Sequence, residues 1–272
     1  MAFNPERGKY YRMPIFFGPK YGPRMWPEGR TMDFDNFPKR RSFGVSFLSD
    51  VDQLNALLPE CFEVWGEPIV TVEVTYLTEL GWLAGRGYNM CDVKFNVVYK
   101  GEGEPIHGTL VLVRWENLTD PILSGREELG HNKLYCEIPP VRILDGHYAA
   151  DMSWLAFPFL KVKIWDLKAV PNPAANPQNK GMLSYKYIPK TGEWGEAEVE
   201  YATLTPPAKQ GRVLQRLEGQ GSIEWVPTTW DDIPTQHHIV EAFRALEVKK
   251  VIYGYLWDGE GGASAAATHI LP

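Results

Sequence analysis

The residue whose setting most clearly indicates chemistry is Lys133, within the segment PILSGREELGHNKLYCEIP at residues 121–139. A Gly-Arg-Glu turn precedes a short stretch typical of a helix, and the lysine follows in weakly charged surroundings. A neutral lysine amine attacks carbonyl carbons and forms Schiff bases. Burial among apolar groups or a second cation nearby lowers the pKa of the amine and makes it neutral. Lys133 is therefore a candidate for Schiff-base formation. Most lysines are solvated surface charges and a bare Gly-Arg-Glu is a weak signal, so the residues alone leave both interpretations open.

Short strands are expected to position this segment, because apolar residues alternate along much of the chain. Within 69–77, for example, the valines at 70, 72 and 74 face one way and Glu73 faces the other. Further strands are expected at 43–47, 93–99, 107–115, 160–165, 182–188, 196–204 and 248–257. Short helices are expected after Asp50, at 125–131 and at 235–247. The pattern predicts a mainly β protein with a few short helices, arranged as a sandwich or barrel.

Composition excludes several classes of protein. A chain of 272 residues can bury a sizeable core without staples, and its net charge of −6 argues against a general nucleic-acid binder. No apolar run is long enough for a membrane-spanning helix, and the first residues show no secretory signal. Three cysteines are too few for a disulfide framework or a cysteine-based zinc site. We therefore expect a cytoplasmic protein that interacts with neither nucleic acid nor membrane and carries no metal.

The two ends of the chain differ from its middle. Residues 1–41 contain nine basic and four acidic residues, a balance of +5, so that the remainder carries −11. This stretch is rich in proline, glycine and aromatic residues, and we interpret it as an extended basic arm that packs on its own body or on a neighbouring subunit. Binding of RNA or an anionic surface is the alternative. Residues 42–257 are expected to form one domain, followed by a flexible tail of small residues at 258–272.

Several ordered blocks resemble a known family. Besides the lysine segment, they are RRSFGVSFLSDVDQLNALLPECFEV, EPIVTVEV, LVLVRWENLTDPILSGREE, KGMLSYKYIP and HHIVEAFRALEVKKVIYGYLW. In this order they resemble the acetoacetate decarboxylase family over roughly residues 40–257. The resemblance implies the β-barrel-like fold of that family, a Schiff-base lysine, no cofactor and a homo-oligomer.

The resemblance also assigns expected roles to individual residues. Lys133 falls on the Schiff-base lysine, and Arg40 on the arginine near the active site, with Arg41 adjacent. Glu73 and Glu127 fall on two family glutamates and are the further catalytic candidates, as proton carriers or as members of a structural ion-pair network.

Two positions depart from the family pattern. Leu134 stands where the decarboxylases carry a second lysine, and Met90, with Tyr88 beside it, stands where they carry a loop glutamate. These departures leave open whether the reaction is a decarboxylation or an aldol-type reaction with dehydration, as in other members of the superfamily. Tyr88 suits a larger, aryl-bearing carbonyl substrate.

The expected substrate is a small carbonyl compound or keto acid. Arg40 is expected to hold its carboxylate, with Tyr88 and Met90 as further substrate-binding candidates. Tyr253 and Tyr255 share one face of the last strand and are candidates as well, although core tyrosine is the commoner fate. The competing prediction is a non-catalytic β-barrel that binds an apolar or aromatic small molecule, which has no need of a lysine with a lowered pKa.

Overall fold

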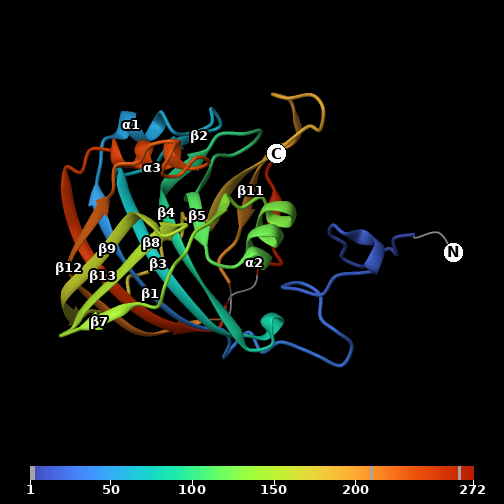
Figure 1. Ribbon diagram of the computed structural model, residues 1–272, viewed down its shortest axis with the longest axis horizontal. Helices are drawn as coiled ribbons and strands as arrows, with labels where there is room; N and C mark the ends of the chain where they lie inside the picture. The colour runs from blue at the N-terminus through green and yellow to red at the C-terminus, as the bar shows by residue number, and fades with distance from the viewer. Residues whose placement is uncertain (1–3, 209–210, 263–264) are drawn as a thin grey trace.

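The computed structural model describes residues 4–208, 211–262 and 265–272, which fold around one large sheet (Figure 1). Its strands are β1 (Lys39–Leu48), β2 (Phe62–Val64), β3 (Ile69–Leu80), β4 (Arg86–Tyr99), β5 (Ile106–Glu116), β6 (Lys133–Tyr135), β7 (Arg142–Leu144), β8 (His147–Trp154), β9 (Phe157–Ala169), β10 (Met182–Pro189), β11 (Ala197–Thr205), β12 (Arg212–Trp225), β13 (Lys250–Glu260) and β14 (His269–Ile270). The helical segments are η1 (Ile15–Phe17), α1 (Val51–Asn55), η2 (Gly81–Leu83), α2 (Thr119–Ser124), η3 (Gly125–Leu129) and α3 (His237–Arg244).

The sheet is strongly curved but open. Its strands follow the order β14-β11-β10-β5-β4-β3-β1-β13-β12-β9-β8-β7, with β2 paired to β4 and β6 paired to β5. The prediction of a mainly β fold with a few short helices is confirmed. The expected barrel does not close. The sheet instead ends at two edge strands, β14 and β7, which do not pair with each other.

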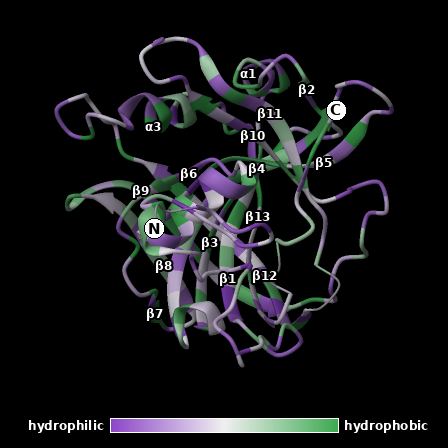
Figure 2. Cartoon of the chain, turned by 90° about the vertical axis from the view of Figure 1, so that its right-hand side faces the viewer, coloured by the Kyte–Doolittle hydropathy of each residue, from purple (hydrophilic) through white to green (hydrophobic). Residues whose placement is uncertain are grey.

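The core lies on one face of the central strands. Val70, Val72 and Val74 of β3 are fully buried there, as their alternation predicts. Helix α3 covers part of the same core, where Phe243 packs edge-on against Trp115 of β5 with ring centroids 6.2 Å apart. The alternation shows as hydrophobic and hydrophilic bands along the strands in Figure 2. The opposite face of the central strands is therefore free to carry polar side chains.

The ends of the chain are joined to the sheet and to each other. The backbone N–H groups of Gly261 and Gly262 donate to the carbonyls of Pro38 and Phe34. Near the C-terminus, β14 pairs with β11, and Leu271 is buried. The expected domain boundaries at 41/42 and 257/258 thus fall inside β1 and β13, and part of the expected flexible tail belongs to the fold. The parts of the arm and tail at 1–3 and 263–264 lie outside the described residues.

None of the helices within the described ranges has the length and apolar character needed to cross a membrane.

Candidate active site

Strand register brings residues that are distant in sequence into one row on the polar face. Across β13, β1, β3, β4, β5 and β6 the directly paired residues are Tyr255, Gly44, Glu73, Asp92, Arg114 and Lys133. Directly paired residues share a face of the sheet. The neighbouring rows place Arg40 beside Leu77 and Tyr88, and Met90 beside Glu116. The polar face therefore gathers charged groups around Lys133.

Lys133 is buried although it is a lysine, with an exposed fraction of 5%. Its Nζ lies 2.8 Å from Oε1 of Glu116 and donates to the carbonyl of Pro121 at 2.9 Å. Burial lowers the pKa of Lys133, the charge of Glu116 opposes that shift, and the Arg114 guanidinium adds to it. Loss of the proton therefore costs less here than in an exposed lysine.

The crossover between β5 and β6 fixes the position of Lys133. These two strands are parallel, and α2 and η3 connect them. A Cβ atom on Gly125, where the two helices meet, would lie only 2.5 Å from Cδ and Cε of Lys133. Arg126 Nη1 donates to the backbone carbonyl of Lys133 at 2.8 Å. The Gly-Arg pair thus leaves room for the lysine side chain and anchors its backbone.

Two further charged groups face the lysine. Arg114 donates from Nε and Nη2 to both carboxylate oxygens of Asp92 at 2.6 Å. Burial opposes the charge of Arg114, but Asp92 outweighs it, and the pKa of Arg114 stays above its ordinary value. Glu116 is fully buried, and burial raises the pKa of its carboxyl even though Lys133 and Arg114 act against that shift. Asp92 therefore neutralises Arg114, whereas Glu116 faces Lys133.

A cavity of about 200 Å³ opens beside the lysine. The described residues that line it are Pro23, Arg24, Arg40, Leu77, Trp82, Tyr88, Met90, Arg114, Pro121, Ser124, Gly125, Leu129, His131, Lys133, Met182, Thr205 and Ala265. This lining contains three arginines and a lysine but no aspartate or glutamate. Arg24, Arg114 and Lys133 are each paired with a carboxylate that lies outside this lining. Among the described lining residues, Arg40 is therefore the cation that remains to attract an anionic ligand.

Arg40 is the cavity arginine that makes no ion pair within the described chain. Its guanidinium carbon lies 5.3 Å from the centre of the Trp257 ring, a cation–π contact. Burial lowers its pKa and the charge of Glu73 opposes the shift. The adjacent Arg41 instead forms two hydrogen bonds with Asp258, at 2.8 and 2.9 Å. Arg40, and not Arg41, is therefore the arginine that faces the cavity.

The N-terminal segment forms one wall of the cavity through Pro23 and Arg24. It is held by Glu128 of η3, which accepts a hydrogen bond from Arg24 Nε at 2.9 Å and forms an ion pair with Lys20. Burial opposes ionisation of Glu128, but the hydrogen bonds from Lys20 and Arg24 outweigh it and lower its pKa. In Figure 1 this segment lies to the right of α2, and in Figure 2 it passes in front of the strands. The part of the arm around Lys20 and Arg24 therefore contacts the body of the protein, whereas Phe16 and Phe17 are largely exposed. The expected placement of the whole arm stays a prediction.

Four of the residues proposed from the sequence meet at this cavity. Arg40, Tyr88, Met90 and Lys133 all line it. Their catalytic and binding roles stay predictions. Burial, with the charge of Glu116, raises the pKa of Tyr88, so that its hydroxyl stays protonated as a donor.

Glu73 and Tyr255 lie behind the cavity in a network of their own. Glu73 lies 2.8 Å from Lys94 Nζ and accepts hydrogen bonds from the Tyr255 hydroxyl at 2.6 Å and from Trp257 Nε1 at 3.3 Å. Burial opposes its charge, but Lys94 and these hydrogen bonds lower the pKa of Glu73 to about 2. Neither Glu73 nor Tyr255 lines the cavity. Their geometry supports the ion-pair alternative for Glu73 and a structural position for Tyr255.

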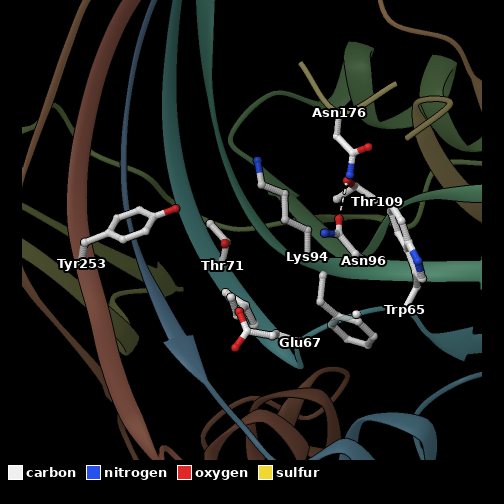
Figure 3. A pocket seen from close by; sticks show the side chains of 11 residues that line it. Trp65, Glu67, Thr71, Lys94, Asn96, Thr109, Asn176 and Tyr253 are labelled. Atoms are coloured by element: carbon white, nitrogen blue, oxygen red, sulfur yellow. Dashed lines mark hydrogen bonds between the residues drawn. The ribbon is translucent and has the colours of Figure 1, made fainter. Parts of the chain in front are cut away.

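Glu127 and Tyr253 lie apart from the cavity. The side chain of Glu127 is 34% exposed, and its carboxylate lies 4.0 Å from Arg12 Nε. Tyr253 lines another hollow, of about 430 Å³, further along the polar face, where it lies across from Trp65 and Asn96 (Figure 3). The geometry does not bring these two predicted site residues to Lys133, and their roles remain untested predictions.

Sequence reasoning did not identify four groups at the site, namely Glu116, Arg114, His131 and Trp82. Glu116 and Arg114 belong to the block VRWEN, in which strand alternation places both on the face opposite the buried Trp115. This alternation about Trp115 is the feature of the sequence from which the two residues could have been identified. Nothing local marks Glu116 as buried, because its burial depends on β6 pairing alongside β5.

Within the described ranges, no three side chains of His, Cys, Asp or Glu are grouped so that they could hold a metal ion.

The site is thus a buried, ion-paired lysine beside a cavity on the polar face of an open, mainly β sheet. A family model described as acetoacetate decarboxylase (ADC) matches residues 12–259. The chain therefore belongs to the acetoacetate decarboxylase family. No curated protein gives a significant match.

Solved structures share this fold. An acetoacetate decarboxylase superposes with a TM-score of 0.66 at 14% identity, covering 88% of each chain. The acetoacetate decarboxylase of Legionella pneumophila gives 0.64 at 19% identity, covering 92% of this chain and 94% of its own. The enduracididine biosynthesis enzyme MppR, complexed with the condensation product of pyruvate and imidazole 4-carboxaldehyde, gives 0.63 at 16%, covering 92% and 95%. At these identities the likeness establishes the fold.

Proposed function

We propose that this protein is a lyase that makes or breaks a carbon–carbon bond through a Schiff base on Lys133. The observation that carries the proposal is the position of its Nζ, which belongs to a buried side chain at the wall of a cavity of about 200 Å³. Burial lowers the pKa of this amine, and a neutral amine is the form that attacks a carbonyl. Membership of the acetoacetate decarboxylase family supports the same class of reaction.

The proposed reaction begins with attack of the Lys133 amine on a ketone or aldehyde carbonyl. Loss of water gives a protonated imine, which accepts the electron pair of a bond β to the imine carbon. If that bond leads to a carboxylate, carbon dioxide leaves. If it leads to a carbinol carbon, an aldehyde leaves, and in reverse the enamine attacks an aldehyde.

The lining of the cavity favours the aldol-type direction, because Met90 lines it where the family decarboxylases carry a glutamate. Arg40 lacks an ion-pair partner in the described chain and is placed to bind a substrate carboxylate by paired hydrogen bonds. The family decarboxylases carry an arginine at the position that Arg40 resembles, so Arg40 supports a substrate with a carboxylate without choosing between the two reactions. We therefore propose a 2-oxo acid as the nucleophilic substrate.

The remaining wall fits an apolar or aromatic aldehyde as the second reactant. Trp82 and Tyr88 lie edge-on with ring centroids 6.4 Å apart, and Met90 lies beside them. Aromatic and methionine side chains suit flat, apolar groups. The MppR structure with a condensation product of pyruvate and an aromatic aldehyde supports this choice of substrate pair.

The test compares two reactions of the purified protein. Acetoacetate is supplied alone and carbon dioxide is measured, and pyruvate is supplied with an aromatic aldehyde and the condensation product is measured. We expect condensation to exceed decarboxylation and both to disappear in Lys133→Ala. Dominant release of carbon dioxide would contradict the aldol direction, and full activity of Lys133→Ala would contradict the Schiff base.

The same experiment distinguishes the lyase from the competing hypothesis, a non-catalytic protein that binds an apolar small molecule. An apolar hollow of about 500 Å³ next to α3, lined in part by Leu110, Leu134 and Phe243, offers a place for an apolar ligand. A binding protein of that kind turns over neither substrate set and retains its ligand in Lys133→Ala.

A further inference from the structure

Glu116 is the carboxyl group in contact with the reactive nitrogen. Its exposed fraction is 0%, and Oε1 lies 2.8 Å from Lys133 Nζ. Oε2 has no hydrogen-bond partner among the described residues. A buried carboxyl oxygen without a partner is costly, and its presence calls for an explanation.

The neighbours of the pair do not supply that explanation. Arg114 already has both of its short hydrogen bonds with Asp92, so that Glu116 is not needed to neutralise it. His131 accepts or donates one contact with Thr205 at 3.2 Å, and burial lowers its pKa well below the ordinary value. Tyr88, the remaining titratable group near Glu116, stays protonated because burial raises its pKa. Lys133 is therefore the group with which Glu116 can exchange a proton.

We propose that Glu116 is the acid–base partner of Lys133 in Schiff-base formation. It takes the proton that the ammonium must lose and later gives a proton to the hydroxyl group that leaves the carbinolamine. This inference rests on the proposed function, because it concerns the same lysine. Glu116 counts as catalytic because it touches the reacting nitrogen.

The protons balance over the two stages. Neutral Lys133 and protonated Glu116 meet the substrate carbonyl, the nitrogen–carbon bond forms, and a proton moves from nitrogen to the former carbonyl oxygen. Glu116 then protonates that hydroxyl, which leaves as water while the nitrogen lone pair forms the double bond. The products are a protonated imine, the Glu116 carboxylate and one water molecule. The carbinolamine oxygen is two bonds from Nζ and so forms close to Glu116.

The pair can reach its reactive form without exchanging protons with solvent. The forms Lys–NH₃⁺/Glu–COO⁻ and Lys–NH₂/Glu–COOH have the same net charge, and burial disfavours the charged form of each residue. Imine formation should therefore change little with pH over the range in which the pair holds one proton in total. Without Glu116, the rate should follow the pKa of Lys133 alone.

The decisive experiment separates the nucleophilicity of the amine from loss of water. Acylation of Lys133 by acetic anhydride needs only the neutral amine. Formation of a pyruvate imine, trapped with excess cyanoborohydride and located by peptide mass spectrometry, also needs the hydroxyl to leave. Both rates are measured as a function of pH for the wild-type protein and Glu116→Gln, with thermal unfolding as the check on folding.

We expect Glu116→Gln to acylate at Lys133 at least as fast as the wild-type protein at pH 7, because it loses the anion that holds the ammonium charged. Imine trapping should slow by roughly 100-fold, the lower range of general acid–base contributions. Its pH profile should change from flat to rising. If the glutamine variant does not fold, Glu116→Asp replaces it. In that variant imine trapping should again slow more than acylation does, with a smaller loss than in Glu116→Gln.

Other outcomes would overturn the inference. If the rate of imine trapping in Glu116→Gln changes by the same factor as the rate of acylation, Glu116 only balances the charge of the lysine. In that case the wild-type adduct on Lys133 would still support the proposed function. Absence of a wild-type adduct would instead remove the proposed function, and this inference with it.

Discussion

At the scale of a single residue, the surroundings of Lys133 act on its pKa in opposite directions. Burial and the charge of Arg114 lower its pKa, whereas Glu116, 2.8 Å from its Nζ, raises it. Because burial has the largest effect, the lysine loses its proton more readily than a lysine in water does. The same burial raises the pKa of Glu116. Nucleophile and acid therefore arise from one desolvated pair.

Arg40 should determine affinity for acidic substrates. In Arg40→Met the KM for pyruvate should rise by roughly 10- to 100-fold, the equivalent of a charge-assisted hydrogen bond worth about 1.5–3 kcal/mol. The KM for the uncharged methyl ester should change much less. Steady-state kinetics with both compounds provide the measurement.

The matched control for this prediction is Arg41→Met. Arg41 pairs with Asp258 and lies outside the cavity lining, so its loss should leave both KM values near those of the wild-type protein. Equal effects on the acid and the ester in Arg40→Met would contradict a role in binding carboxylate.

Single residues differed in how far their positions could be predicted. Lys133 and Arg40 were found through motif resemblance, and the structure places both at one cavity. Glu116 was missed because a glutamate at the end of a strand is usually exposed. Only the parallel pairing of β6 with β5, which no local pattern announces, brings Lys133 alongside it. Glu127 shows the converse, because its position in the motif suggested a role, whereas it is not among the residues that line the cavity.

At the scale of elements, the α2–η3 crossover between β5 and β6 positions the lysine. Gly125 has ordinary right-handed helical dihedral angles, φ −70° and ψ −46°, so alanine suits its backbone. An added Cβ would nevertheless lie 2.5 Å from the end of the Lys133 side chain. In Gly125→Ala we expect kcat to fall at least about 10-fold, in line with the cost of displacing a reacting group. The melting temperature should change little, because a flexible side chain can move aside.

Gly22→Ala provides the control for adding a methyl group to a glycine. A Cβ there would meet only Lys20 Nζ, at an ordinary 3.7 Å, and activity should be retained. A Gly125→Ala enzyme with wild-type kcat would show that the close packing of this turn does not position Lys133.

Glu128 should govern how the N-terminal segment covers the cavity. It contacts Lys20 and Arg24, and the segment carries Pro23 into the cavity wall. In Glu128→Gln the pairing weakens, so limited trypsin digestion should cut the segment faster and the KM should rise several-fold. Glu63→Gln, which breaks an exposed pair with Lys100, serves as the control. Unchanged digestion in Glu128→Gln would contradict this role.

Elements with clear alternation were predictable, and others were not. Strands β3, β5 and β10 overlap the expected ranges closely because one of their faces is buried and the other polar. Strand β12 was missed, because its glycines at 219 and 221 interrupt any alternation. Those glycines are needed where neighbouring backbone passes close, as a Cβ at 219 would lie 2.4 Å from the carbonyl oxygen of Trp165. Such close approaches depend on the partner strand and leave no periodic signal.

At the scale of the whole molecule, one open sheet serves two purposes. One face holds the core, and the other carries the charged row that ends at Lys133. The mainly β character could be predicted from alternation. The open edges at β14 and β7 could not, because closure depends on how far curvature accumulates over the whole sheet.

Glu73 should link the stability of the whole fold to pH. Its pKa of about 2 lies below the value of 4.5 expected in the unfolded chain. A lowered pKa contributes stability above the unfolded value, and the contribution is lost as the pH falls toward 2. The shift corresponds to about 3 kcal/mol. Glu73→Gln should therefore unfold more easily at pH 7 by about that amount, and the difference should shrink below about pH 5.

Urea unfolding at several pH values measures this difference. Glu224→Gln, which removes an exposed partner of Lys161, should cost less than about 1 kcal/mol with no such trend. A constant deficit of Glu73→Gln from pH 7 to pH 3 would contradict the ion-pair role of Glu73.

The most direct test of the central claim is borohydride trapping followed by peptide mass spectrometry. Acetoacetate, pyruvate and an aryl β-keto compound are each incubated with the wild-type protein and with Lys133→Ala. We predict a reduced adduct on Lys133 with at least one compound, best with the 2-oxo acid, and none in the variant. An adduct on another lysine such as Lys94, or turnover that persists in Lys133→Ala, would contradict the Schiff-base account.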